Sequence, residues 1–180
     1  MLAHLFAFLA NLAVFSMIGA AAVPETHRIL WPEAYGLSQI APGGWTDAPD
    51  RAAEFRALAD ASRDRVIAFF GDIPPQPGIV FCASQECAAV FGIGGNGLSV
   101  ADVAVMVSPG GLSIGTLTHE MTHSRLHRAM GLSNVVRQPY PTWFDEGLAT
   151  HVADHPRWPG EVTPAARQRV RQVHRFSEYR

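Results

Sequence analysis

The stretch that decides the fold is residues 113–130, which read SIGTLTHEMTHSRLHRAM. Ser113 is of a residue type that caps helix N-termini, and Gly131 is of the type that ends helices. Between these two points, apolar side chains recur on one face at helical spacing: Ile114, Leu117 and Met121. The pattern predicts an amphipathic helix over residues 113–130, with an apolar face that packs on the rest of the domain.

The centre of this helix carries the segment HEMTH, residues 119–123. His119 and His123 lie one turn apart on the same face, with Cβ atoms about 5–6 Å apart. Two imidazoles in this arrangement can bind one zinc ion at about 2.0–2.1 Å. Glu120 follows the first His, so its carboxylate can face a water molecule whose pKa zinc lowers to about 7. We therefore predict metal ligands at His119 and His123 and a general base at Glu120.

A second helix is expected to begin at Thr142 and to run to about Asp154, ahead of Pro156. Thr142 and Asp145 fit the capping-box pattern, in which each side chain satisfies a backbone N–H group of the other residue. Glu146 follows within the sequence WFDEGLA and is placed to supply a third metal ligand. Three protein ligands with one open position are typical of catalytic zinc sites.

HEMTH followed by WFDEGLA resembles the gluzincin metallopeptidases, the thermolysin-like group that uses two His and one Glu. The chain is most similar to the small bacterial, membrane-anchored members of the peptidase MA-like group, over about residues 100–156. The resemblance implies a site with these members: His119, His123 and Glu146 as zinc ligands, and Glu120 as catalytic base. The metzincin pattern does not fit, because Leu126 and Ala129 stand where it requires Gly and His.

Several supporting groups are left open by the sequence. Gluzincins also use a Tyr or His that stabilises the oxyanion. Such a group can lower the free energy of the transition state by several kcal/mol. The candidates for it lie late in the chain: Tyr140, His151, His155, His174 and Tyr179. A carboxylate should orient each ligand His, and Asp145 and Asp154 are the candidates. His127 lies one turn beyond His123 and is rotated away from His119, so we expect it to face solvent or to support a ligand.

The chain before the motif helix should supply a helix and a short sheet. A helix is expected from Asp47, acting as N-cap, to near Gly71. The elements expected after it are a strand over 79–83, a short helix over 84–91, a flexible glycine-rich loop over 92–97 and a strand over 103–107. We expect the last strand to offer an edge to which an extended peptide can add. A final helix is expected over 164–176, near the C-terminus.

The N-terminal segment differs from the rest of the chain in its composition. The first 23 residues contain no Asp, Glu, Lys or Arg, and Leu5–Val23 is almost wholly apolar. This length is close to the about 20 residues that span a bilayer, and Ala20–Ala22 also fits a small-residue cleavage site. We expect residues 1–23 to be a signal peptide or a membrane anchor, with the remaining chain outside the cytoplasm. Residues 24–46 are expected to form an irregular linker, and residues 47–180 the metallohydrolase domain.

The two cysteines, Cys82 and Cys87, are five positions apart. In an oxidising compartment they could close a small disulfide loop. Two buried thiols are the alternative.

Taken together, the sequence predicts an α+β fold: a small zincin-like domain with a short sheet, an HExxH helix and a following helix with a Glu ligand. A net charge of −2 and the lack of a basic stripe argue against nucleic-acid binding. The expected function is zinc-dependent hydrolysis of peptide bonds in a peptide or protein substrate. Two alternatives remain open, a zinc amidase acting on cell-wall peptides and a zinc-binding regulatory module with weak or no turnover.

Overall fold

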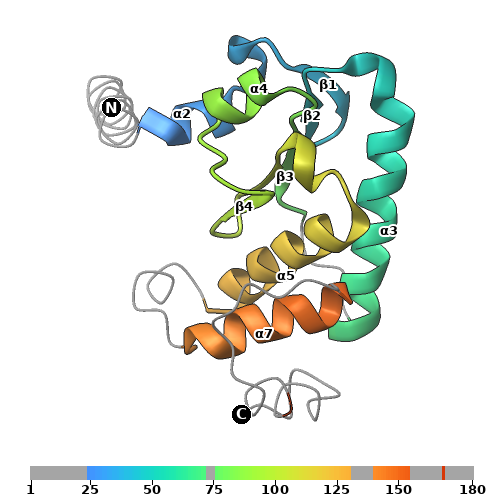
Figure 1. Cartoon of the computed structure of the whole chain (residues 1–180), viewed down its shortest axis with the longest axis vertical. Helices are drawn as coiled ribbons and strands as arrows, with labels where there is room; N and C mark the ends of the chain where they lie inside the picture. Colours follow the sequence, from blue (N-terminus) through green and yellow to red (C-terminus); the bar gives the residue numbers. More distant parts are fainter. Residues whose placement is uncertain (1–23, 72–75, 131–139, 155–167, 169–180) are drawn as a thin grey trace, which may run out of the picture.

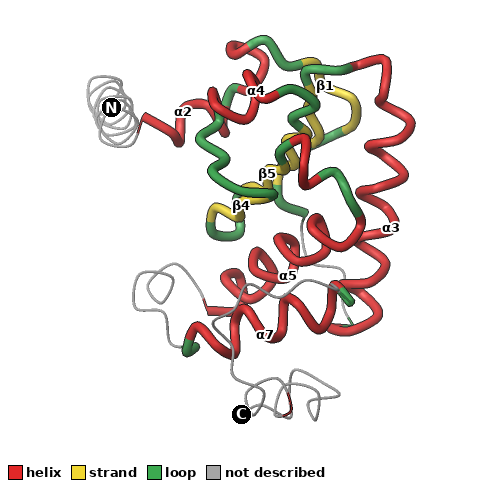
Figure 2. Tube along the Cα trace, viewed as in Figure 1, coloured by secondary structure: helices red, strands yellow, loops and turns green. Residues whose placement is uncertain are grey.

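The computed structural model describes residues 24–71, 76–130, 140–154 and 168. These residues form a mixed α+β fold around one five-stranded sheet (Figures 1 and 2), as the sequence predicts. The strands are β1 (Ser38–Ala41), β2 (Gly44–Thr46), β3 (Gly78–Phe81), β4 (Gly97–Val100) and β5 (Ala104–Val107). The helices are α2 (Pro24–Leu30), α3 (Ala52–Phe70), α4 (Gln85–Val90), α5 (Ile114–Met130) and α7 (Thr142–Ala153). Short 3-10 turns are η1 (Pro32–Tyr35), η2 (Pro49–Arg51) and η3 (Pro109–Gly111).

The sheet has the strand order β1-β2-β3-β5-β4. β2, β3 and β5 run parallel, while β1 and β4 are antiparallel to their neighbours. The strand expected over 103–107 is present as β5, but the expectation that it offers an edge is wrong, because β3 and β4 pair with its two sides. The edge strand that contacts α5 is β4, which has no counterpart among the predicted strands.

The core lies on both faces of the sheet, because successive side chains of β3 and β5 point to opposite sides. One set packs against α3 and α5: Ile79, Phe81, Val105 and Val107. The ring of Phe55 on α3 stacks on Phe81 at a centroid distance of 5.0 Å. The other set packs with α4 and the segment before β1: Val80, Cys82 and Met106. Burial on both faces explains why β5 is wholly apolar rather than alternating.

The segment 24–46, expected as an irregular linker, belongs to the fold. It forms α2, η1, β1 and β2, and β2 pairs in parallel with β3 through Trp45 and Val80. The sheet therefore begins before residue 47. Its two first strands are short and surround Pro42-Gly43, so their composition is that of a loop, and pairing with β3 makes them strands.

Asp47 does not cap the helix that follows it, contrary to the sequence prediction. The chain first makes the 3-10 turn η2, and α3 begins only at Ala52. The Asp47 carboxylate instead accepts hydrogen bonds from the backbone amides of Ala83 and Ser84, at 2.7 and 3.0 Å. It thereby fixes the connection between β3 and α4. The predicted end of the helix is confirmed, since Gly71 has a φ of +78° and closes α3.

The start of α5 is fixed by a side-chain cap, as the sequence predicts. The Ser113 hydroxyl accepts a hydrogen bond from the Thr116 amide at 3.1 Å. We expect Ser113→Ala to lower the free energy of unfolding by about 1 kcal/mol, because that amide then loses its partner. Urea unfolding of the two proteins measures the change. Ser38→Ala, at an exposed serine on β1, is the control, and an equal loss there would contradict the assignment.

Cys82 and Cys87 form a disulfide between the end of β3 and α4, which resolves the two alternatives left by the sequence.

The segment 1–23 and the helix expected over 164–176 lie outside the described residues. Within residues 24–71, 76–130 and 140–154, no helix combines the length and hydropathy that crossing a membrane requires.

Candidate metal centre

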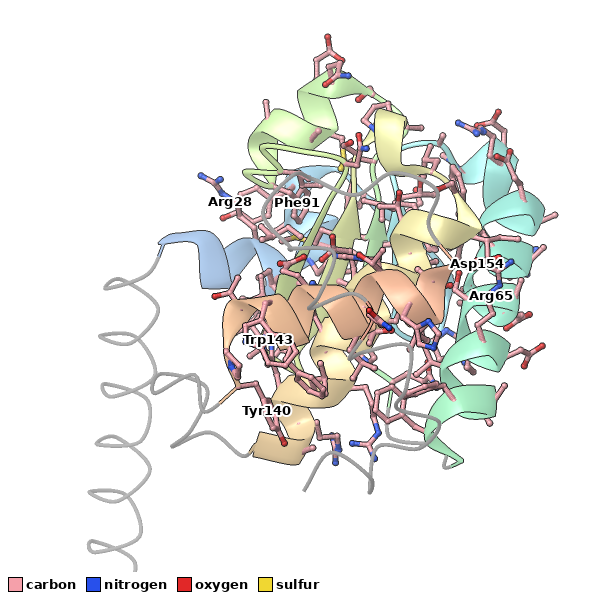
Figure 3. The ribbon with its side chains drawn as sticks, turned by 60° about the horizontal axis from the view of Figure 1, so that its bottom comes forward. Arg28, Arg65, Phe91, Tyr140, Trp143 and Asp154 are labelled. Atoms are coloured by element: carbon pink, nitrogen blue, oxygen red, sulfur yellow. A yellow bond between two sulfur atoms is a disulfide. The ribbon has the colours of Figure 1, made fainter. Side chains whose placement is uncertain are left out.

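The site lies where α5 packs against α7, the most extensive contact between elements in the described part of the chain. A small apolar cluster joins the two helices: Leu126 on α5, and Phe144 and Leu148 on α7. The far end of α7 is tied to α3, because the Arg65 guanidinium donates to the Ala153 carbonyl at 2.8 Å (Figure 3). The apolar cluster and this hydrogen bond fix α7 relative to α5, and with it the residues that α7 contributes to the site.

Three predicted residues come together between the helices. Nε2 of His119 and Nε2 of His123 are 3.0 Å apart, and each lies near a carboxylate oxygen of Glu146, at 3.3 and 3.6 Å. All three donor groups lie within 4.8 Å of one another, an arrangement that could hold a metal ion. A tetrahedral zinc with bonds of about 2.0–2.1 Å keeps its ligand atoms about 3.3 Å apart. The three separations bracket this value, so the residues fit such an ion.

Asp145 supports the site and does not form the expected capping box. Thr142 is the first residue of α7, Pro141 is the N-cap, and the cap has no side-chain hydrogen bond. The Asp145 carboxylate instead lies 2.9 Å from Nδ1 of His123. This contact places the proton of His123 on Nδ1 and leaves Nε2 as the atom that can bind a metal. Of the two carboxylates weighed from the sequence, the structure selects Asp145 for His123. Asp154 is exposed and ends α7 in a left-handed conformation.

His123 and Glu146 each shift the pKa of the other. Burial alone would lower the pKa of His123, but hydrogen bonds to Asp145 and Glu146 and their charges outweigh it and raise the pKa to about 10. The pKa of Glu146 is held well below its usual range by hydrogen bonds to His119 and His123. A metal ion must therefore displace a proton from His123, so metal affinity should increase with pH.

We expect Asp145→Asn to weaken intrinsic zinc affinity by about 10–100-fold, because the imidazole loses its orienting carboxylate. The variant should also have a lower His123 pKa, so protons compete less with the metal at neutral pH. The ratio of wild-type to variant affinity should consequently grow as the pH rises from about 7 towards about 10. Competition with a chromophoric chelator across this range measures it. Asp154→Asn is the control, and a ratio that falls with pH would count against this role for Asp145.

Glu120 is directed at the edge strand β4. A Cβ atom built on Gly97 would lie 2.6 Å from Cγ of Glu120 and 2.8 Å from its Oε1, so the carboxylate occupies the space that a side chain would need. Burial raises the pKa of Glu120, and the charges of His123 and His119 and a hydrogen bond from the Ser99 backbone amide oppose this rise. The predicted base is therefore a partly buried carboxylate between the metal-binding group and the backbone of β4.

A second close contact fixes β4 relative to α5. The Asn96 carbonyl accepts hydrogen bonds from the Ser108 amide and hydroxyl, at 3.0 and 3.3 Å. The same carbonyl packs on Gly111, where an added Cβ would lie 1.7 Å from it. Gly111 ends η3, three residues before α5 begins. Sequence reasoning missed Asn96, Gly97 and Gly111. The signal for Asn96 and Gly97 was the glycine-rich composition of residues 92–97, which indicated a flexible loop, and Pro109-Gly110-Gly111 indicated only a turn.

The remaining residues that the sequence suggested as supporting groups of the site are His127 and the candidates for stabilising the oxyanion. Nδ1 of His127 lies 3.3 Å from the Ala101 carbonyl, and its ring stacks on that of His123 at a centroid distance of 6.3 Å, so this residue ties α5 to the turn after β4. Among the described residues, the ring of Tyr140 lies 5.5 Å from that of Phe144, and the ring of His151 lies 6.0 Å from that of Phe69. His155, His174 and Tyr179 lie outside the described residues.

Comparisons of the chain with protein-family models, with curated proteins and with solved structures found no match. Function is therefore inferred from the chemistry of this chain's own residues.

Proposed function

We propose that the protein is a zinc metallopeptidase with a zincin-like domain, as its resemblance to the gluzincins implies. The observation that carries the proposal is the convergence of His119, His123 and Glu146 between α5 and α7. Two imidazoles and one carboxylate are the number and kind of ligands found in catalytic zinc sites. Calcium and magnesium prefer sets made only of oxygen atoms, so this mixed set favours zinc.

When bound, zinc would supply Lewis acidity, which polarises a carbonyl group and makes water acidic near neutral pH. Glu120 accepts the proton of the attacking water and returns it to the leaving amine. Its raised pKa suits this double role, because a carboxyl whose pKa lies closer to the working pH can both accept a proton and release it again. Asp145 keeps His123 in the tautomer that binds the metal.

The proposed substrate is an extended peptide that pairs with the outer edge of β4. Peptides commonly add to an exposed strand through main-chain hydrogen bonds. Glu120 contacts this strand at Gly97 and Ser99, so a peptide paired there would pass directly in front of the carboxylate. This relocates strand addition from β5, which is paired on both sides, to β4.

The protein is proposed to work outside the cytoplasm. The Cys82–Cys87 disulfide supports this location, since disulfides persist in oxidising compartments. The charge-free apolar segment over residues 1–23 supports it independently, as a signal peptide or membrane anchor.

The test is zinc content and hydrolysis measured on the same preparations. We expect the wild type to bind about one equivalent of zinc after reconstitution and to cleave members of a peptide library. Glu146→Ala should lose most of the zinc and all detectable cleavage, because one of three ligands is removed. Glu86→Ala, an exposed glutamate on α4, is the matched control and should behave as the wild type.

The outcomes separate the alternatives. Zinc below roughly 0.1 equivalents in the wild type would refute the metal site. Full zinc loading without cleavage of any peptide or cell-wall fragment would favour a regulatory module over an enzyme. Cleavage of cell-wall fragments alone would identify the protein as a zinc amidase.

A further inference from the structure

An exposed apolar patch lies at the N-terminal end of the described chain. It is formed by α2, the turn η1 and the last residue of α4. The exposed fractions of its members are 56% for Leu30, 51% for Trp31, 37% for Tyr35 and 40% for Val90. We refer to these four side chains as the N-terminal patch. Soluble surfaces seldom gather large apolar side chains in this way, so the patch needs an explanation.

The N-terminal patch is held in place by defined contacts. The ring of His27 packs on Trp31 at 4.7 Å, and its Nδ1 is 3.1 Å from the Tyr35 hydroxyl. The Arg28 guanidinium donates to the Val90 carbonyl, which joins α2 to α4, and Figure 3 shows Arg28 beside Phe91. Ile29 faces the other way and packs on the core cluster around Val80 and Phe91. α2 therefore has an inner side that packs on the domain, while Leu30 at its end and Trp31 directly after it lie exposed on the outer side.

The sequence identifies what this outer side would meet. α2 begins at Pro24, directly after a 23-residue segment that contains no Asp, Glu, Lys or Arg. With a rise of about 1.5 Å per residue, Leu30 and Trp31 lie only about 10 Å along the helix from the end of that segment. The headgroup layer of a bilayer has a similar depth, and Trp and Tyr are the side chains enriched in it.

We infer that the N-terminal patch is a membrane-contacting surface that lies in the headgroup region next to the point where residues 1–23 enter the bilayer. Two acidic groups lie near the patch. Glu33 accepts a hydrogen bond from the Trp45 indole at 2.6 Å, and Glu86 lies one turn before Val90, at the border of the patch. The contact would give the domain a fixed orientation on the membrane, beyond simple tethering.

The test uses the full chain in vesicles of phosphatidylcholine and phosphatidylglycerol. Both native cysteines are in the disulfide, so one introduced cysteine gives a unique site for an environment-sensitive fluorophore. Leu30→Cys and Val90→Cys place the probe in the patch. Val103→Cys is the matched control, because Val103 is 48% exposed and lies in the turn between β4 and β5. Flotation of the vesicles measures binding of the whole chain in parallel.

On vesicle binding, probes at positions 30 and 90 should shift their emission to shorter wavelength and lose intensity to a nitroxide-labelled lipid. The probe at position 103 should change little. Flotation with no change at 30 and 90 would leave the anchor intact and overturn the inference. Equal changes at all three positions, or no flotation, would overturn it as well. Emission at short wavelength from positions 30 and 90 already in the absence of vesicles would mean that protein covers the patch, and it would overturn the inference. The cover would be a second copy if the emission depends on protein concentration, and residues 1–23 if it does not.

Discussion

Replacing Glu120 with Gln should lower kcat/KM for peptide hydrolysis by about 10²–10⁴-fold while leaving the zinc content unchanged. The carboxylate is the general base of the proposed reaction, and positioned bases contribute a factor of this size. It lies outside the group formed by His119, His123 and Glu146, so the amide should not disturb metal binding. Steady-state cleavage and metal analysis on the same samples measure the two effects.

Glu86→Gln provides the control for this substitution, because it makes the same chemical change at an exposed position on α4. The pH dependence of wild-type activity is a second test of the role of Glu120. Because burial raises the pKa of Glu120, activity should decline with falling pH at a higher pH than an exposed glutamate would give. A variant with full zinc and wild-type activity would exclude Glu120 as the base.

Gly97→Ala should reduce kcat by about 10²-fold without loss of zinc. The new Cβ would lie 2.6 Å from Cγ of Glu120, so the carboxylate has to move, and misplacement by about 1 Å can cost this much. Gly95→Ala is the matched control, because a Cβ at that glycine meets nothing within 4 Å. Comparable losses in both variants would point to a general effect on the loop before β4.

A second-site change distinguishes displacement of Glu120 from distortion of β4. Glu120→Asp removes one methylene group from the side chain that collides with residue 97. If the collision is the cause, Gly97→Ala should cost much less in the Glu120→Asp background than in the wild type. Additive losses would instead indicate that the alanine alters the strand itself.

The elements with a long periodic pattern were predictable. α5 has a serine cap and buries Leu117, Met121 and Leu126 at helical spacing, although Ile114 is exposed, and its bounds match the prediction to one residue. The histidines of HEMTH follow directly from that helix, because two residues four apart must share a face. Glu146 was predicted from the resemblance and from the helix that carries it. The structure brings all three side chains into one group.

Features that depend on contacts between distant segments were not predictable. The sequence offers Asp145 as a capping-box residue and also, beside Asp154, as a carboxylate that could orient a ligand His, and only the packing of α7 on α5 decides for the contact with His123. β1, β2 and β4 have three or four residues each, too few to show a period of two, and glycine or proline lies within or beside them. Their pairing partners, rather than their own composition, make them strands.

The short edge strand β4 also bears on how the protein behaves in concentrated solution. An exposed strand edge is a template for sheet growth between molecules, and long flat edges promote aggregation. β4 has only four residues and is followed directly by Ala101, whose φ of +49° turns the chain away. An edge of this length can hold one short extended peptide, but it offers little backbone for fibril growth. The short edge of β4, which we propose as the place where the substrate binds, should therefore also favour solubility.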